Sequence, residues 1–147
     1  MLVVMKPATV VVSLPVADLE RSLRFYRDGL GLQTPGIDEY MIAFELPNLS
    51  LFLIELSEYA TYVERAGIST PASAHPGALV LSCAMGSKKE IDDAVSRATD
   101  AGGSAQPAAG HDGAYTGYVS DPDGHLWELV FNDRTAAAAA ATGGSES

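Results

Sequence analysis

The stretch Asp-Pro-Asp-Gly-His-Leu-Trp-Glu-Leu, residues 121–129, decides the fold of this chain. Its first four residues predict a tight turn, because proline presets φ and glycine takes positive φ without strain. The apolar and aromatic residues at 115–120 and 125–131 therefore predict the two strands of a β-hairpin. Glu128 lies in the returning strand between two apolar residues. A buried charge needs a compensating partner, so Glu128 is either a functional group in a cleft or an exposed residue on a solvated sheet face.

The first half of the chain repeats this arrangement. Turn residues at 47–50 precede an apolar strand that ends in Glu55, as the later strand carries Glu128. Two matching strands, 10–13 and 79–82, each lead into a helix-like stretch of amphipathic pattern, 19–30 and 88–101. Two copies of one strand–helix–strands unit in the same order indicate a duplicated architecture.

Both helical stretches are bounded by residues that are typical of helix ends. Asp18 and Ser87 precede the two helical stretches and are predicted to be their N-caps. Glycines at 29 and 31 end the first stretch, and Gly102 with Gly103 ends the second. We interpret both helices as elements that pack on sheets.

Composition limits the class of protein. A chain of 147 residues with 47% hydrophobic content builds one well-buried domain. Nineteen acidic against nine basic residues give a formal charge of −10, which argues against a nucleic-acid partner. The acidic surface favours a cationic ligand, although solubility alone also accounts for it. No apolar run reaches the length of a membrane span, and the single Cys83 excludes an internal disulfide framework, so we expect a cytoplasmic protein.

Breaks in composition mark the organisation of the chain. We predict a single domain over residues 1–133, with modules at about 9–58 and 77–132 and a polar linker at 59–76 that contains Gly and Pro. An alanine run followed by Thr-Gly-Gly-Ser-Glu-Ser has no apolar period that would hold it to a core. We therefore expect residues 134–147 to form a flexible tail.

Two motifs together carry a resemblance to a known family. The pattern Val-Ser-Leu-Pro-Val-x-Asp-Leu-x-Arg-Ser-Leu-x-Phe-Tyr-x-x-x-Leu-Gly at residues 12–31, with the stretch at 121–129, resembles the vicinal oxygen chelate superfamily. This superfamily includes glyoxalase I, extradiol dioxygenases, fosfomycin-resistance enzymes and bleomycin-resistance proteins. The resemblance covers residues 9–132. It implies an α+β fold of two βαβββ modules that form a curved mixed sheet around a cleft, and it implies a homodimer.

The resemblance also bears on metal binding. Metal-dependent members place ligands at four strand positions, commonly His and Glu, and Glu55 and Glu128 match two of them. Val11 and Ala78 stand where the two histidines are expected. Two carboxylates without imidazole make a poor site for zinc, nickel or iron, and calcium or magnesium needs more oxygen ligands. We expect no transition metal and no other cofactor, while a weak divalent site between the two glutamates stays open.

Strand alternation predicts which side chains line the cleft. A four-residue turn at 121–124 sets residue 117 opposite Glu128, which puts Tyr115 on the face of Glu128. The same counting about residues 47–50 puts Phe44 on the face of Leu53 and Glu55. These five residues are the predicted substrate-binding set, an apolar lining with two carboxylates. The floor is completed by residues of the opening strands: Val11, Ser13, Ala78, Val80 and Ser82. The alternative for Leu53 and Val80 is a purely structural place in the core between sheet and helix.

Two function classes remain open, so the sequence does not decide whether the chain is an enzyme. In the first, it binds or sequesters a small cationic or aromatic compound without a transition metal. In the second, it is a lyase, isomerase or dioxygenase-like enzyme whose catalytic Glu128 acts as general base next to a carbonyl. The missing histidines and the acidic composition favour binding, whereas the retained carboxylates favour chemistry. The identity of the ligand depends on loop residues at 57–76 and 104–116.

Overall fold

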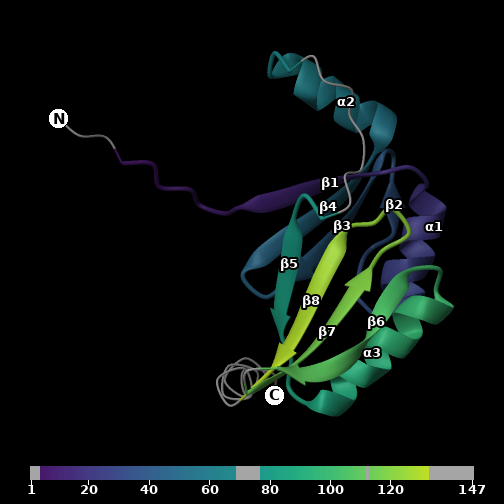
Figure 1. Ribbon diagram of the computed structural model, residues 1–147. Helices are drawn as coiled ribbons and strands as arrows, with labels where there is room; N and C mark the ends of the chain where they lie inside the picture. Colours follow the sequence, from purple (N-terminus) through teal and green to yellow (C-terminus); the bar gives the residue numbers. More distant parts are fainter. Residues whose placement is uncertain (1–3, 69–76, 112, 133–147) are drawn as a thin grey trace.

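The computed structural model describes residues 4–68, 77–111 and 113–132. It confirms the α+β class and the two βαβββ modules (Figure 1). Module 1 consists of β1 (Val11–Val16), α1 (Leu19–Leu23) continued by the π-helical η1 (Arg24–Gly29), β2 (Ile37–Asp38), β3 (Met41–Leu46) and β4 (Leu49–Glu55). Module 2 consists of β5 (Val80–Ala84), α3 (Lys88–Asp100), β6 (Ser104–His111), β7 (Ala114–Ser120) and β8 (Leu126–Phe131).

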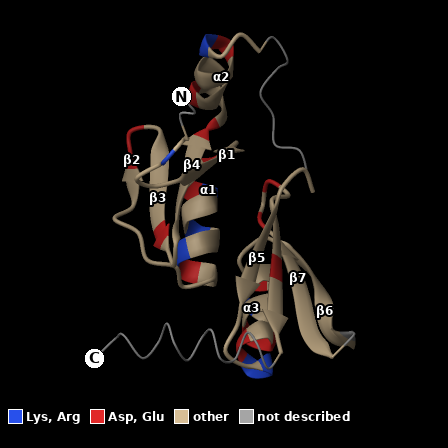
Figure 2. Cartoon of the chain, turned by 90° about the vertical axis from the view of Figure 1, so that its left-hand side faces the viewer, with Lys and Arg blue, Asp and Glu red and all other residues tan. Residues whose placement is uncertain are grey.

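Each module has its own four-stranded mixed sheet. The strand orders are β1-β4-β3-β2 and β5-β8-β7-β6, so the same topology occurs twice. The first strand of each module pairs in parallel with the last, and the other pairs are antiparallel. Strands β1 and β5 consequently lie at sheet edges, and Figure 2 shows the two sheets as separate units.

The helix starts are capped at the predicted residues. The Asp18 carboxylate accepts a hydrogen bond of 3.1 Å from the Arg21 backbone N–H, and the Ser87 hydroxyl accepts one of 3.1 Å from that of Glu90. Each cap satisfies a backbone donor that the first helical turn leaves free. Gly102 adopts a φ of 97° just after α3, the left-handed conformation that ends a helix.

The connection between the modules begins with a further helix, α2 (Leu56–Arg65), which extends from the end of module 1 (Figures 1 and 2). None of its residues is buried. The later part of the predicted linker, residues 69–76, and the predicted tail lie outside the described residues. None of the helices in the described part of the chain is long and apolar enough to cross a membrane.

One buried apolar cluster contains side chains of both modules. The aromatic residues Phe25 and Tyr26 of η1 belong to it and are fully buried, with their ring centroids 4.9 Å apart. The cluster continues through Phe44 of β3 and through Ile91 and Trp127 of module 2. Burial of this surface is the main term that stabilises the fold, and it holds the two modules together on the helix side of their sheets.

Candidate functional site

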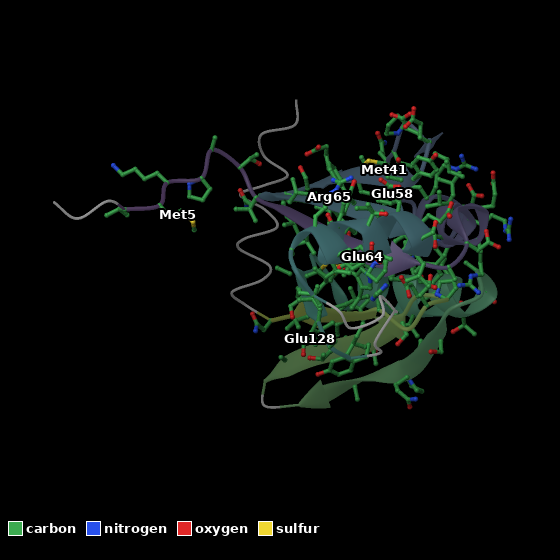
Figure 3. The ribbon with its side chains drawn as sticks, turned by 90° about the horizontal axis from the view of Figure 1, so that it is seen from above. Met5, Met41, Glu58, Glu64, Arg65 and Glu128 are labelled. Carbon is green, nitrogen blue, oxygen red and sulfur yellow. The ribbon has the colours of Figure 1, made fainter. Side chains whose placement is uncertain are left out.

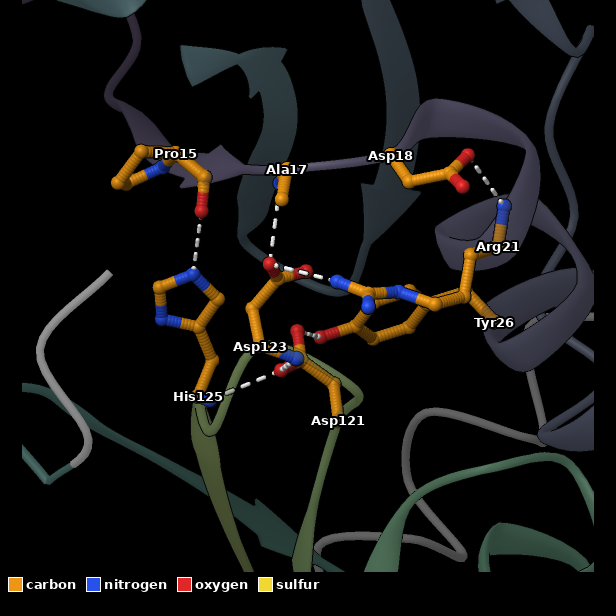
Figure 4. Close-up of polar contacts among 8 residues, drawn as sticks. All are labelled: Pro15, Ala17, Asp18, Arg21, Tyr26, Asp121, Asp123 and His125. Atoms are coloured by element: carbon orange, nitrogen blue, oxygen red, sulfur yellow. Dashed lines mark hydrogen bonds and ion pairs between the residues drawn. The ribbon is translucent and has the colours of Figure 1, made fainter. Parts of the chain in front are cut away.

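The Asp-Pro-Asp-Gly-His turn is organised around the carboxylate of Asp121, which is 3% exposed. Its Oδ1 accepts hydrogen bonds from the backbone N–H groups of Asp123, at 2.9 Å, and His125, at 2.8 Å. Its Oδ2 accepts a hydrogen bond of 2.6 Å from the Tyr26 hydroxyl, which belongs to the other module (Figure 4). One side chain thus shapes the turn and also attaches it to η1.

Two further side chains of this turn reach module 1 (Figure 4). The Nε2 of His125 lies 2.7 Å from the carbonyl oxygen of Pro15, and since a carbonyl only accepts, this nitrogen carries a proton. The Asp123 carboxylate accepts from the Ala17 backbone N–H at 3.0 Å and from the Arg21 guanidinium at 2.9 Å. The motif is therefore a polar clamp between the modules. We predicted only its hairpin, because partners this distant in sequence leave no signal in local spacing.

Burial shifts the pKa of two buried groups, Tyr26 and Asp121. It raises the pKa of Tyr26 well above the ordinary tyrosine value, and the nearby Asp121 charge raises it further. Burial also raises the pKa of Asp121, although the hydrogen bond from Tyr26 opposes this shift. The indole Nε1 of Trp127 donates to the Tyr26 hydroxyl oxygen at 3.1 Å. The Tyr26 hydroxyl is therefore a neutral donor to Asp121 and an acceptor for Trp127, which is a structural role.

Glu128 lies at the centre of a different polar group, on β8. Ser82 of β5 and Tyr118 of β7 are its direct neighbours in the sheet on either side. The Ser82 hydroxyl donates to Oε1 at 3.0 Å, and the Tyr118 hydroxyl donates to Oε2 at 2.7 Å. The hydrogen bond to Glu128 raises the pKa of the Tyr118 phenol, which therefore stays protonated at neutral pH. Both oxygens of the carboxylate are held in place by hydroxyls from neighbouring strands.

The face that carries Glu128 is open. The residues before and after Glu128 in the strand, Trp127 and Leu129, point to the other side of the sheet, where they are buried in the core with Ile91 of α3. Glu128 is half-buried on the side of the sheet away from that helix. Figure 3 labels Glu128 on its strand. Tyr118 is 41% exposed and Val80 is 45% exposed on the same face. A charged anchor is thus surrounded by accessible apolar and aromatic surface.

The predicted register of this hairpin was wrong by one residue. Glu128 lies opposite Tyr118 rather than residue 117, because the backbone N–H of Asp121 bonds the carbonyl of His125 at 3.0 Å. The loop is therefore three residues long and ends in Gly124 with a φ of 91°, a common hairpin connection. A slip of one residue moves a side chain to the other face. Tyr115 consequently lies on the helix side, where its hydroxyl donates to Asp92 of α3 at 2.6 Å.

In module 1, Phe44 and Leu53 share a face as predicted, but their register differs from the predicted one and the face is the core. The loop has two residues, Pro47 and Asn48, instead of the assumed four, and a difference of two residues keeps each side chain on its face. Phe44 lies opposite Leu51, and Leu53 lies opposite Ile42. Phe44 and Leu53 have no exposed surface, and the Phe44 ring centroid lies 5.5 Å from that of Tyr26. These two residues fill the structural place that the sequence left as the alternative for Leu53.

Glu55 does not occupy the place in module 1 that Glu128 occupies in module 2. When the opening strands of the two modules are matched, Ser13 takes the position of Ser82. Ser13 lies opposite Phe52, so Phe52 is the residue of module 1 that corresponds to Glu128. Glu55 is the last residue of β4, three positions farther along, and its carboxylate accepts a hydrogen bond of 2.6 Å from the Ser57 hydroxyl at the start of α2. The structure shows no hydrogen bond between Glu55 and Glu128.

Hollows on the described surface include three that Glu128 does not line. One lies between η1 and α3 around Arg24 and Arg97, a second lies beside Met85 and Glu90, and the third lies beside Gln33 and Glu45. Of the predicted floor, Val11, Ala78, Val80 and Ser82 are exposed in the single chain, and Ser13 is half-buried. The candidate site is therefore an open sheet face.

The donor set does not fit a transition metal. Within the described residues, no group of three or more His, Cys, Asp and Glu side chains is placed to hold a metal ion. Val11 and Ala78 offer no ligand atoms on their side chains. Both oxygens of Glu128 already accept hydrogen bonds from hydroxyls. Zinc, nickel and iron require imidazole, thiolate or several carboxylate ligands, which these residues do not supply.

Comparisons with known proteins agree with this architecture. A glyoxalase-related enzyme from Fulvimarina pelagi is 28% identical, with a TM-score of 0.74 over 87% of this chain and 89% of that one. A lactoylglutathione lyase from Agrobacterium tumefaciens is 21% identical, with a TM-score of 0.61 over 86% and 95%. An antibiotic-binding protein from a Streptomyces species is 18% identical, with a TM-score of 0.58 over 88% and 99%. The last two likenesses show the fold alone. Curated proteins gave no match.

The match to a sequence family covers most of the chain. It extends over residues 8–129, which include both motifs and all strands and helices of the two modules except the last two residues of β8. The repeated βαβββ topology and the shared fold of the solved structures point the same way. This chain belongs to the Glyoxalase/Bleomycin resistance protein/Dioxygenase superfamily.

Proposed function

We propose that this chain binds a small cationic or aromatic compound on the open face of the β5, β8 and β7 strands, and that binding rather than catalysis is its function. The observation that carries the proposal is the Glu128 carboxylate, fixed by Ser82 and Tyr118 on an accessible face. The Tyr118 ring and Val80 offer apolar contact beside the charge. The formal charge of −10 also favours a cationic ligand.

The proposed site works without a transition metal. Val11 and Ala78 stand at the positions where the family resemblance predicts histidines, and neither side chain offers a ligand atom. The lyase, isomerase or dioxygenase-like alternative needs Glu128 as a base that reaches a substrate proton. The hydroxyls of Ser82 and Tyr118 instead direct their hydrogens at both of its oxygens, which suits a fixed anchor better than a proton acceptor.

The proposed assembly is a homodimer in which a second copy covers the edges of strands β1 and β5 and leaves the face of Glu128 accessible. Edge strands β1 and β5 carry no charged residue, and exposed valines lie on both, Val11 at 40% and Val80 at 45%. Uncharged apolar edges invite pairing with another chain unless a partner covers them. Helix α2, with no buried side chain, adds a further face that a second copy would cover.

The half-buried free thiol of Cys83 suits a reducing compartment, so we propose that the protein is cytoplasmic.

A titration with tryptamine, an aromatic compound with one ammonium group, tests the binding function. Calorimetry should detect millimolar or tighter binding to the native chain, and Glu128→Gln should weaken it by about 1–3 kcal/mol, the usual cost of losing a charged hydrogen-bond partner. Tyr115→Phe removes a similar hydroxyl–carboxylate bond from the helix side and is the matched control. Unchanged affinity in Glu128→Gln, together with a lower melting temperature, would instead assign Glu128 to structural support.

A further inference from the structure

We infer that Ser82 and Tyr118 make the Glu128 site selective for ligand groups that carry N–H donors, such as a primary ammonium, over quaternary ammonium groups and anions. The inference rests on the proposed binding function of this face. It assigns a specificity-determining role to two hydroxyls that face Glu128 from the adjacent strands.

The first argument for this selectivity comes from the directions of the two hydrogen bonds to Glu128. A hydroxyl group has one donor hydrogen and two acceptor lone pairs. Ser82 directs its hydrogen to Glu128 Oε1 and Tyr118 directs its hydrogen to Oε2. With both hydrogens committed, the two hydroxyls offer only lone pairs to a ligand. The three side chains therefore present acceptors and one negative charge, but no donor.

The second argument comes from the sheet register, which sets the three polar side chains side by side. Ser82 and Tyr118 lie directly opposite Glu128 on its two sides, so the three side chains form a row across β5, β8 and β7. Neighbouring strands lie about 4.8 Å apart, which keeps the three groups within reach of one small ligand. A primary ammonium has three donor hydrogens and matches a cluster of acceptors. A quaternary ammonium keeps the charge but has no hydrogen to donate, and an anion meets repulsion.

The third argument comes from the apolar residues on the same face of the sheet. Val80 and Leu126 lie opposite each other two residues before Ser82 and Glu128, so they project from the same side of the sheet. Ala84 and Val130 occupy the corresponding places two residues after them. The polar row is thus bordered on both sides by apolar contacts, which would accept an aromatic or alkyl ligand body.

The chain supplies a matched control for the two hydroxyls. Tyr115 donates to Asp92 at 2.6 Å, much as Tyr118 donates to Glu128 at 2.7 Å, but it lies on the helix side of the same strand. Tyr115→Phe and Tyr118→Phe remove the same atom from neighbouring places in the sequence. Only Tyr118→Phe alters the proposed site.

The test is a titration of four indole compounds against the full chain: tryptamine, its N,N,N-trimethyl derivative, the neutral 3-ethylindole and the anion indole-3-acetate. We expect the native chain to prefer tryptamine over the trimethyl compound about tenfold, the factor for hydrogen bonds worth about 1.4 kcal/mol. Ser82→Ala and Tyr118→Phe should each lower this ratio, whereas Tyr115→Phe should preserve it. Circular dichroism melts of each variant check that the fold is intact.

Different outcomes separate the inference from the function on which it rests. If both cations bind equally well to the native chain, and Glu128→Gln weakens both, the selectivity inference is wrong while the binding function stands. Retention of the native ratio in both Ser82→Ala and Tyr118→Phe would also overturn it. If none of the indoles binds, or Glu128→Gln leaves both cations unaffected, the proposed function fails and the inference fails with it.

Discussion

The hydroxyl of Tyr26 donates a hydrogen bond of 2.6 Å to the carboxylate of Asp121, although the two residues belong to different modules. The bond is buried, and Asp121 also holds the backbone of its own turn through two N–H groups. A substitution of Tyr26 therefore alters the packing of the core, the hydrogen bonds of the turn and the contact between the modules. The residues that decide the fold in sequence also join its two halves.

Replacing Tyr26 by phenylalanine should destabilise the protein. The change leaves Asp121 Oδ2 without its donor and the Trp127 indole without its acceptor, both in buried surroundings. An unsatisfied buried polar group costs about 1–3 kcal/mol, and more when it is charged. Urea denaturation at neutral pH measures the free energy of unfolding. Tyr40→Phe, at a tyrosine that is 50% exposed, should give a value close to that of the native chain.

Alkaline conditions should destabilise the fold through the same residue. The pKa of Tyr26 is raised in the folded state, so above the ordinary tyrosine pKa of about 10 the unfolded chain releases this proton while the folded chain retains it. The stabilising contribution is fully present below that pH and is lost as pH rises toward the folded-state pKa. Unfolding free energies between about pH 8 and 11 should fall more steeply for the native chain than for Tyr26→Phe. Parallel profiles would mean that Tyr26 titrates alike in both states.

The comparison of the two hairpins shows what local sequence predicts and what it does not. Alternation placed Leu53 on the same face as Phe44 correctly, although the loop has two residues instead of the assumed four, because a difference of two residues preserves the face. It misplaced Glu128 by one residue, because Asp121 pairs with His125 and shortens the loop. The caps at Asp18 and Ser87 were correct, since they depend on neighbours within one helical turn. Contacts between distant segments, such as Tyr26 with Asp121, follow only once both modules are folded.

The candidate site was predicted only in part for the same reason. Glu128 was identified from its place between apolar residues, and Ser82 from its strand, but Tyr118 was missed because the register error put it on the wrong face. Phe44 and Leu53 share the apolar alternation of lining and core residues, which sequence alone does not separate. A count based on a three-residue loop ending in Gly124 would have found Tyr118.

Gly103 should not tolerate a side chain. A Cβ at this position would overlap the Phe25 ring of module 1 and the Ser120 carbonyl of β7. Overpacking a close contact of this kind costs about 1–3 kcal/mol, so Gly103→Ala should lower the melting temperature. Gly110→Ala is the control in the same region, because its nearest atom would lie at 4.0 Å. Equal melting temperatures for the two variants would show that the contact between η1 and β7 relaxes freely.

Metal analysis should find no tightly held transition metal. The positions of Val11 and Ala78 lack imidazole, and Glu128 alone is too small a ligand set. Protein purified without added metal should contain far less than one equivalent of nickel, zinc or iron. Glu128→Gln should leave the content unchanged. Near-stoichiometric metal that disappears in Glu128→Gln would contradict this prediction and restore metal-dependent chemistry as a candidate.

The proposed homodimer should depend on the exposed edge of module 2. A glutamate at Val80, which is 45% exposed on edge strand β5, would place a charge in any interface that covers this strand. Buried unpaired charges are strongly unfavourable, so Val80→Glu should convert a dimer to a monomer. Light scattering after size exclusion at micromolar protein gives the mass. Tyr40→Glu, at an equally exposed residue of the β2–β3 turn, should preserve the dimer because it lies next to the opposite edge of the sheet of module 1. A native chain that is already monomeric would refute the proposed assembly, and a dimer that persists in Val80→Glu would place its interface elsewhere.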